Sequence, residues 1–170
     1  MPRKRNSLLI FLFVVLAVAK MNSTIRVVTS LNDAGTGSLR QAIRSASSGD
    51  TIRFNPSLIS SGSAAIILDS SIIESDKSLV IKGLYNNTDT LFIAGDYTFN
   101  TFDFHNSLPN SYLVFDSLIL VNPRNRSISC VNYDTIKITN CVVYNTGISP
   151  AGGGVELTNF IRPIYVYVSK

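Results

Sequence analysis

Three aspartates in the second half of the chain are the first residues to consider for catalysis. Asp103, Asp116 and Asp134 are of the type that holds calcium in a polysaccharide lyase or pairs across the cleft of a glycosidase. Acids for this chemistry would recur at equivalent repeat positions. However, Asp116 aligns with Thr139, and Asp134 aligns with Ser111, in the repeat described below. Solvated turn aspartates are the simpler interpretation, although irregular spacing still allows the three to meet.

The single histidine and the glycines add little chemistry. His105 lies in the turn-like stretch FHNSLPN, where a solvated loop histidine is the usual case and no metal-binding partners are evident. Gly152–Gly154 is not followed by a helical pattern, so it is a turn rather than a phosphate-binding loop. We assign no catalytic, cofactor-binding or metal-ligating residue, and we expect no cofactor.

The aromatic segment Tyr97–Phe104 (YTFNTFDF) could form a platform on which sugar rings stack. Interior stacking is the commoner use of phenylalanine, and the chain has no tryptophan. We therefore favour an interior position for these rings.

Two kinds of covalent modification depend on the compartment. An oxidising compartment would permit a disulfide between Cys130 and Cys141, but two small buried side chains in facing strands fit the sequence equally well. A separation of eleven residues says nothing about their geometry. Three asparagines begin N-x-S/T sequons that matter only in a host that glycosylates them: Asn22, Asn86 and Asn125.

The first nineteen residues are typical of a secretory signal peptide. Arg3–Arg5 is basic, Leu8–Ala19 is an uninterrupted apolar run, and Ala17–Ala19 supplies the small-x-small pattern of a cleavage site. A retained anchor is the alternative, but a spanning helix needs about 20 apolar residues. We predict cleavage after Ala19, and a mature chain that is secreted or displayed at the cell surface and does not span the membrane.

The signal peptide accounts for most of the positive charge. The chain has 15 basic and 11 acidic residues, a net charge of +4. Three of the basic residues lie in the signal, which leaves 12 against 11 in the mature chain. A nearly neutral mature chain gives no reason to expect a nucleic-acid partner.

About 150 residues remain after cleavage, enough for one domain. Charged residues are only 15% of the chain, and short apolar runs alternate with polar turns. This pattern predicts an all-β protein, either a sandwich or a solenoid. The expected strands are Ile25–Thr29, Thr51–Phe54, Ala65–Leu68, Leu79–Ile81, Leu91–Ala94, Thr101–Phe104, Tyr112–Val121, Thr135–Ile138 and Cys141–Tyr144.

An internal repeat favours the solenoid. Leu113–Asn122 (LVFDSLILVN) aligns with Ile136–Asn145 (IKITNCVVYN) at an offset of 23 residues. Repeats of this length are typical of solenoids, whose coils bury their apolar sides by stacking. Residues one repeat apart should be neighbours, about 5 Å apart. Asn122 and Asn145 would then stack at a turn, unless they are two ordinary turn asparagines.

One short amphipathic helix is expected over Ser38–Ala46. Ser38 is a suitable N-cap, and Gln41 completes a capping box. Four apolar residues share one helical face: Leu39, Ala42, Ile43 and Ala46.

Val28–Ile43 (VTSLNDAGTGSLRQAI) and Gly49–Phe54 (GDTIRF) resemble the N-terminal motif of the bacterial SLREAI-motif, choice-of-anchor or polymorphic-outer-membrane-protein-like surface proteins. Gly147–Glu156 (GISPAGGGVE) is similar to the turn between coils of that family. Some members carry a cysteine where Gly37 stands here. The resemblance implies a right-handed parallel β-helix shaped like the pectate lyases, in which Ser38–Ala46 covers the open end of the first coil.

These observations divide the chain into a signal peptide (1–19), an N-terminal cap (20–54), β-helix coils (55–156) and an irregular strand or truncated coil (157–170). In the last part, apolar residues alternate with Tyr165, Tyr167 and Ser169, as in an edge strand. Members of the family are generally longer. We therefore expect a β-helix that is incomplete at its C-terminus.

The expected function is that of an exported, non-catalytic stalk or adhesin-like scaffold rather than an enzyme. Its long sheet faces would meet a surface polysaccharide or another cell-surface ligand. Two alternatives are a pectate-lyase-like, carbohydrate-active enzyme or its remnant, and an exported fragment without a function of its own. The sequence leaves the ligand, the anchoring mode and the oligomeric state open.

Overall fold

The computed structural model describes residues 23–85, 88–95, 99–121, 126–144, 154–159 and 165–169. Several predictions fall outside these residues and stay predictions: the signal peptide with cleavage after Ala19, the sequons at Asn22, Asn86 and Asn125, the pair Asn122 and Asn145, and most of the Gly147–Glu156 turn. No helix in the described part is long and apolar enough to cross a membrane.

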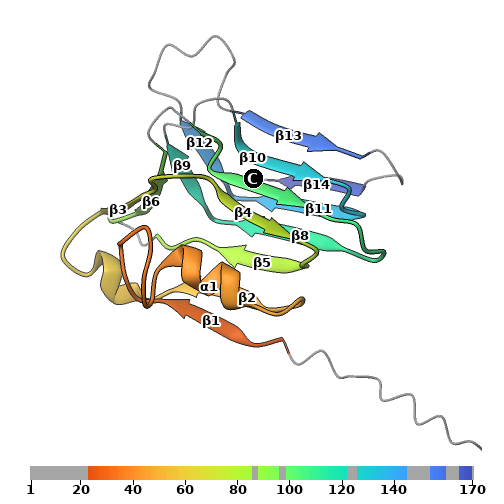
Figure 1. Ribbon diagram of the computed structural model, residues 1–170. Helices are drawn as coiled ribbons and strands as arrows, with labels where there is room; N and C mark the ends of the chain where they lie inside the picture. The colour runs from red at the N-terminus through yellow and green to blue at the C-terminus, as the bar shows by residue number, and fades with distance from the viewer. Residues whose placement is uncertain are drawn as a thin grey trace, which may run out of the picture.

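The chain folds into a right-handed parallel β-helix of four three-stranded coils, which confirms the predicted solenoid (Figure 1). Sheet A contains β1 (Ile25–Val28), β2 (Thr51–Phe54), β5 (Leu79–Lys82), β8 (Tyr112–Asp116), β11 (Thr135–Thr139) and β14 (Tyr165–Ser169). Sheet B contains β3 (Ala64–Ile67), β6 (Leu91–Ala94), β9 (Ile119–Val121) and β12 (Val142–Tyr144). Sheet C contains β4 (Ile72–Ser75), β7 (Phe102–His105), β10 (Arg126–Val131) and β13 (Gly154–Thr158).

The predicted offset of 23 residues is the register between two adjacent coils. Phe115 pairs with Ile138 in sheet A, and Ile119 pairs with Val142 in sheet B. Both pairs follow the sequence alignment. The preceding coil is longer, since Ile81 is the partner of Phe115. Unequal coil lengths explain why only two repeats align clearly in the sequence.

Phenylalanine rings fill the centre of the β-helix. Phe102, Phe104 and Phe115 are fully buried, and their ring centroids lie 5.6, 5.7 and 6.1 Å apart. These separations lie in the range in which aromatic pairs attract one another. Phe102 and Phe104 are therefore not available as a sugar-binding platform, and the interior interpretation is correct for both. Tyr97 lies outside the described residues.

A column of tight turns connects sheet A to sheet B. The run Tyr112–Val121, expected as one strand, bends at Ser117, whose φ of 58° is in the left-handed region, and forms β8 and β9. Asn140 has the same role one coil later, with a φ of 53°. Gly83 occupies the equivalent place one coil earlier, where a Cβ atom would lie only 1.8 Å from the carbonyl oxygen of Ser117. The turns therefore stack so closely that residue 83 has no room for a side chain.

Most of sheet C was not expected from the sequence. The strands β4, β10 and β13 lie in segments that had no predicted strand. In β10 the residues Ser127 and Ser129 are buried, so the strand does not show the usual alternation of apolar and polar residues. The strand β13 begins at Gly154, within the expected Gly-rich turn, and continues past the expected boundary at Glu156.

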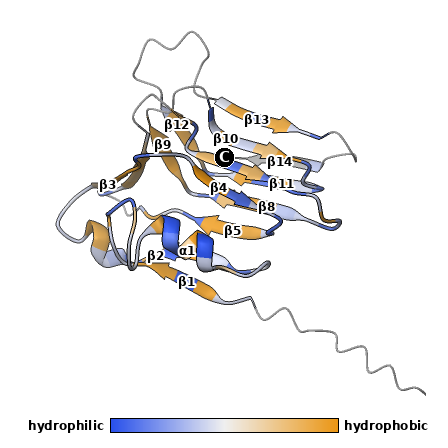
Figure 2. Cartoon of the chain, viewed as in Figure 1, coloured by the Kyte–Doolittle hydropathy of each residue, from blue (hydrophilic) through white to orange (hydrophobic). Residues whose placement is uncertain are grey.

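The predicted helix is present at the N-terminal end as α1 (Leu39–Ser45), where it packs against β1 and β4. The Oγ of Ser38 accepts a hydrogen bond from the backbone N–H of Gln41, at 3.1 Å. Gln41 Oε1 accepts from the N–H of Gly37, at 2.7 Å, one residue further back than a standard capping box. All four predicted apolar residues are buried: Leu39, Ala42, Ile43 and Ala46. Figure 2 shows the hydrophilic outer surface of this helix.

Candidate functional site

The three aspartates considered for catalysis lie in different parts of the β-helix. Asp103 is in β7 of sheet C, whereas Asp116 ends β8 and Asp134 precedes β11 in sheet A. Because Asp116 pairs with Thr139 at the far end of β11, Asp116 and Asp134 are separated by a strand length of about 15 Å. The structure does not bring the three carboxylates into one cleft.

Asp116 stabilises the turn between sheets A and B. It accepts hydrogen bonds from Thr139 Oγ1 at 2.9 Å and Asn140 Nδ2 at 3.2 Å, and Lys82 Nζ lies 3.2 Å away. Partial burial alone would raise the pKa of Asp116, but the hydrogen bonds from Thr139, Lys82 and Asn140 outweigh it and lower the pKa. The carboxylate is therefore ionised and already bound by its neighbours.

The remaining acids also have structural partners. Asp134 Oδ2 accepts hydrogen bonds from the backbone N–H and the Oγ of Ser111, one coil earlier, at 2.9 and 3.1 Å. Asp103 Oδ1 lies 3.1 Å from His105 Nε2. His105 is the last residue of β7 rather than part of a loop, and its side chain is half exposed. Among the described residues, no three His, Cys, Asp or Glu side chains lie close enough to hold a metal ion.

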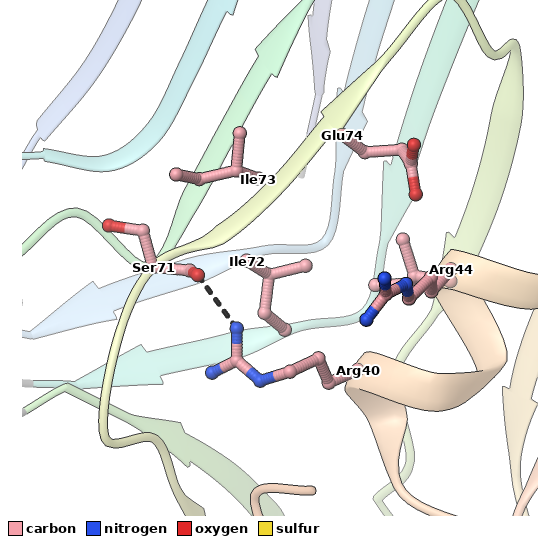
Figure 3. A pocket seen from close by; sticks show the side chains of 7 residues that line it. Arg40, Arg44, Ser71, Ile72, Ile73 and Glu74 are labelled. Carbon is pink, nitrogen blue, oxygen red and sulfur yellow. Dashed lines mark hydrogen bonds between the residues drawn. The ribbon is translucent and has the colours of Figure 1, made fainter.

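A cleft of about 320 Å³ lies between α1 and β4 (Figure 3). Arg40 crosses this space and donates from Nη1 to the carbonyl oxygen of Ser71, at 2.7 Å. Its Nη2 donates to the carbonyl of Ser70 at 2.8 Å, and its guanidinium forms an ion pair with Asp33. The donors of Arg40 are thus used within the protein, so this residue attaches the capping helix to the first coil.

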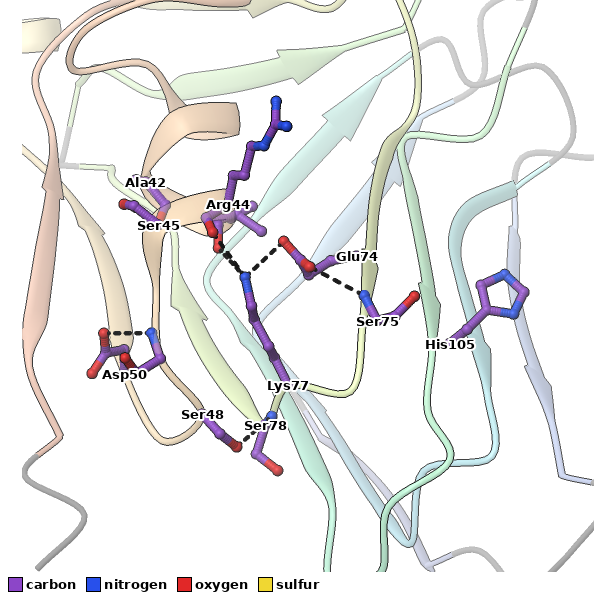
Figure 4. A network of polar contacts seen from close by, with 12 residues as sticks. Ala42, Arg44, Ser45, Ser48, Asp50, Glu74, Ser75, Lys77, Ser78 and His105 are labelled. Atoms are coloured by element: carbon purple, nitrogen blue, oxygen red, sulfur yellow. Dashed lines mark hydrogen bonds and ion pairs between the residues drawn. The ribbon is translucent and has the colours of Figure 1, made fainter.

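A second cation attaches the other end of the helix (Figure 4). Lys77 Nζ donates to the carbonyl oxygens of Arg44 and Ile43, at 2.9 and 3.3 Å, and lies 2.9 Å from Glu74 Oε2. A cation is favourable at this position because the last carbonyls of a helix carry partial negative charge. The space between α1 and β4 is therefore held by two internal cation clusters.

The outer face of sheet A offers a different kind of surface. A shallow cleft of about 340 Å³ on β8, β11 and β14 is almost entirely apolar. Tyr165 and Tyr167 are 63% and 57% exposed, although β14 is fully paired with β11 along one side. The residues that line the cleft are Tyr112, Val114, Thr135, Lys137 and Tyr167.

A charged cleft of about 310 Å³ lies on the same face, over β2, β5 and β8. Arg53, Lys82 and Asp116 follow one another there on adjacent strands in register. Asp116 is paired with Lys82, but no hydrogen bond or ion pair to another described residue forms at the side chain of Arg53 or Lys137. The outer face of sheet A therefore combines exposed tyrosines with two unpaired cations.

None of the residues on this face was selected from the sequence as a candidate site. The alternation of Tyr165 and Tyr167 with apolar residues was visible and correctly predicted an edge strand, β14. Aligning Tyr165 with Thr135 and Tyr112 would have placed the tyrosines on one face. That alignment needs the register between unequal coils, which the sequence alone did not supply.

Both cysteines are free thiols in the structure. Cys130 is buried inside β10, and Cys141 is half-buried in the turn after β11, where its Sγ lies 3.3 Å from the carbonyl oxygen of Thr139. Burial raises the pKa of both thiols. Of the two interpretations left open by the sequence, the structure shows the one without a disulfide.

Comparisons with protein-family models, with curated proteins and with solved structures find no match to this chain. The resemblance of Val28–Phe54 to the SLREAI-motif surface proteins therefore stays a prediction. The fold and the arrangement of side chains are the observations on which a function is argued below.

Proposed function

We propose that this chain is an exported, non-catalytic β-helix segment of a cell-surface or secreted protein, and that it acts as an adhesin-like scaffold. The observation that carries the proposal is the outer face of sheet A, where Tyr165 and Tyr167 stand exposed beside a cleft. Large exposed aromatic side chains gathered on one face are typical of a binding surface.

Two further features support a scaffold. The strands of sheet A are hydrogen-bonded to one another, so the tyrosines stand on a rigid backbone that need not rearrange on binding. The aspartates examined for catalysis are engaged in holding the fold, since Asp116 and Asp134 bind turn residues. The predicted signal peptide supports export of this surface from the cell.

Export is tested by expressing the chain from its first codon in a bacterial host. We expect the exported product to begin at Lys20, as measured by intact mass and N-terminal sequencing. Retention of the whole chain in the cytoplasm would contradict the proposal.

Adhesion is tested with the exported protein coupled to beads, by measuring how many beads remain on cell surfaces under flow. We expect the variant Tyr165→Ser/Tyr167→Ser to lose most retention, because both aromatic contacts are removed. A matched control is Tyr144→Ser, which removes a tyrosine of similar exposure (54%) from sheet B. Equal retention by the tyrosine variant and the control would contradict an adhesive role for sheet A.

A further inference from the structure

We infer that the outer face of sheet A binds an acidic polysaccharide, whose sugar rings stack on the tyrosines and whose carboxylates or sulfates meet Lys137 and Arg53. This inference rests on the proposed function and names the chemical class of its ligand. It follows from the placement of aromatic rings, from the unpaired charge and from the position of the site on a sheet face.

The tyrosines are spaced for a ligand with repeated rings. Tyr112 and Tyr165 share one register row and flank Thr135 between them. Two strand spacings separate the two tyrosines, or about 10 Å. Tyr167 lies in the adjacent row, beside Lys137. A chain of rings laid across β8, β11 and β14 would therefore contact successive tyrosines.

The charge on this face selects an anion. The outward positions of β2, β5, β8 and β11 carry three cations, Arg53, Lys82 and Lys137, against one carboxylate, Asp116. Asp116 is compensated by Lys82, 3.2 Å away. Arg53 and Lys137 remain without a partner among the described residues, so the face has an uncompensated charge of about +2.

A polysaccharide fits this position better than a peptide or a nucleic acid. An extended peptide usually binds at the edge of a sheet, where free backbone groups can pair with it. The face of sheet A presents side chains instead, because its strands pair with one another. A nucleic acid would require cations along a regular phosphate backbone, and only two are unpaired here.

The test is affinity electrophoresis of the exported full-length protein in gels that contain polygalacturonate or the same polymer with its carboxylates methyl-esterified. We expect retardation by polygalacturonate that disappears on esterification and weakens with added NaCl. The apparent Kd should rise about fivefold in Lys137→Gln and about tenfold in Tyr167→Ser. The matched control, Arg44→Gln, removes an exposed cation from α1 and should leave the Kd unchanged.

Other results would overturn the inference in distinguishable ways. Equal binding to the charged and the esterified polymer would reject the acidic ligand but keep an adhesive tyrosine face. Tighter binding to single-stranded oligodeoxythymidylate would replace the polysaccharide by a nucleic acid. Binding to none of these probes would reject the ligand class, and the bead assay would then decide separately whether the proposed adhesive function survives.

Discussion

Lys77 Nζ and the carbonyl oxygen of Arg44 are 2.9 Å apart, although the two residues are separated by 33 positions in the sequence. This contact joins the end of the capping helix to the turn after β4. The backbone of Lys77 also reaches inward, because its carbonyl oxygen accepts a hydrogen bond from Tyr133 Oη at 3.0 Å. One residue thus connects the cap, the first coil and a fully buried tyrosine further along the β-helix.

Removing the ammonium of Lys77 should weaken the attachment of the cap. We expect Lys77→Met to lower the free energy of unfolding by about 1–3 kcal/mol, because charge-assisted hydrogen bonds are lost and Glu74 loses its cation. Urea denaturation measures the loss, and hydrogen exchange should quicken in α1. The control Lys137→Met, at an exposed and unpaired lysine, should change stability by less than about 0.5 kcal/mol. A similar effect of both substitutions would be evidence against this role of Lys77.

The close stacking of turns makes Gly83 irreplaceable. In Gly83→Ala the new Cβ would meet the backbone carbonyl of Ser117, which cannot move without disturbing the next coil. We expect a loss of more than about 3 kcal/mol, or failure to fold, as measured by circular dichroism and thermal melting. Gly35→Ala is the comparison, because open space surrounds Gly35 and only its φ of 91° is unfavourable, so it should cost about 1–2 kcal/mol. A Gly83→Ala protein as stable as Gly35→Ala would show that the turns are not packed as described.

A buried hydroxyl offers a route to greater stability. Thr101 is fully buried, and its Oγ1 atom has no hydrogen-bond partner. The isosteric substitution Thr101→Val removes the uncompensated polar atom, and we expect it to raise the free energy of unfolding by about 1 kcal/mol. Thr101→Ser keeps the hydroxyl and loses a methyl group, so it should destabilise the protein by about 1 kcal/mol. Destabilisation by valine would mean that the hydroxyl is satisfied after all.

Stability should fall in acid because of Asp50, which lies beneath the capping helix and is only 2% exposed. Burial alone would raise the pKa of Asp50. Hydrogen bonds from the backbones of Ser47 and Thr24 and from Arg26 nevertheless lower it below the ordinary value of 3.8. A lowered pKa in the folded state means that Asp50 stabilises the fold above about pH 4. This contribution is lost as the pH falls from 3.8 through the lowered value.

The measurement is the urea midpoint between pH 7 and pH 2.5. We expect Asp50→Asn to be less stable at pH 7 by about 1–3 kcal/mol, and to lose less stability than the unmodified protein on acidification. Asp69→Asn, at an exposed aspartate, serves as the control and should follow the unmodified curve. Parallel pH curves for the unmodified and Asp50→Asn proteins would exclude this contribution.

Local patterns in the sequence were sufficient for the cap and for one pair of coils. The spacing of Leu39, Ala42 and Ile43 identified the buried face of α1, because helical periodicity is a local property. The offset of 23 residues gave the correct register for β8 with β11, because those two coils have no insertion between them. Elsewhere, longer loops change the register, and a fixed repeat cannot be detected.

Long-range relationships were beyond the sequence. A polar stack was expected at Asn122 and Asn145, which lie outside the described residues. A column of asparagines instead follows sheet C, where Asn106 Nδ2 donates to the carbonyl oxygen of Asn132, at 3.2 Å, across adjacent coils. Recognising this column requires β10, a strand whose buried serines conceal it. The tyrosine face depends on the same kind of information, since its members come from three separate coils.

The most direct test of the central claim, that the outer face of sheet A is the binding surface, is tyrosine footprinting by mass spectrometry. The exported protein is iodinated free in solution and while bound to the cell surface on which it is retained. The account predicts protection of Tyr165 and Tyr167 on binding, with unchanged labelling of Tyr144 on sheet B, whose exposure is similar. Protection of Tyr144 with full labelling of Tyr165 and Tyr167 would contradict it.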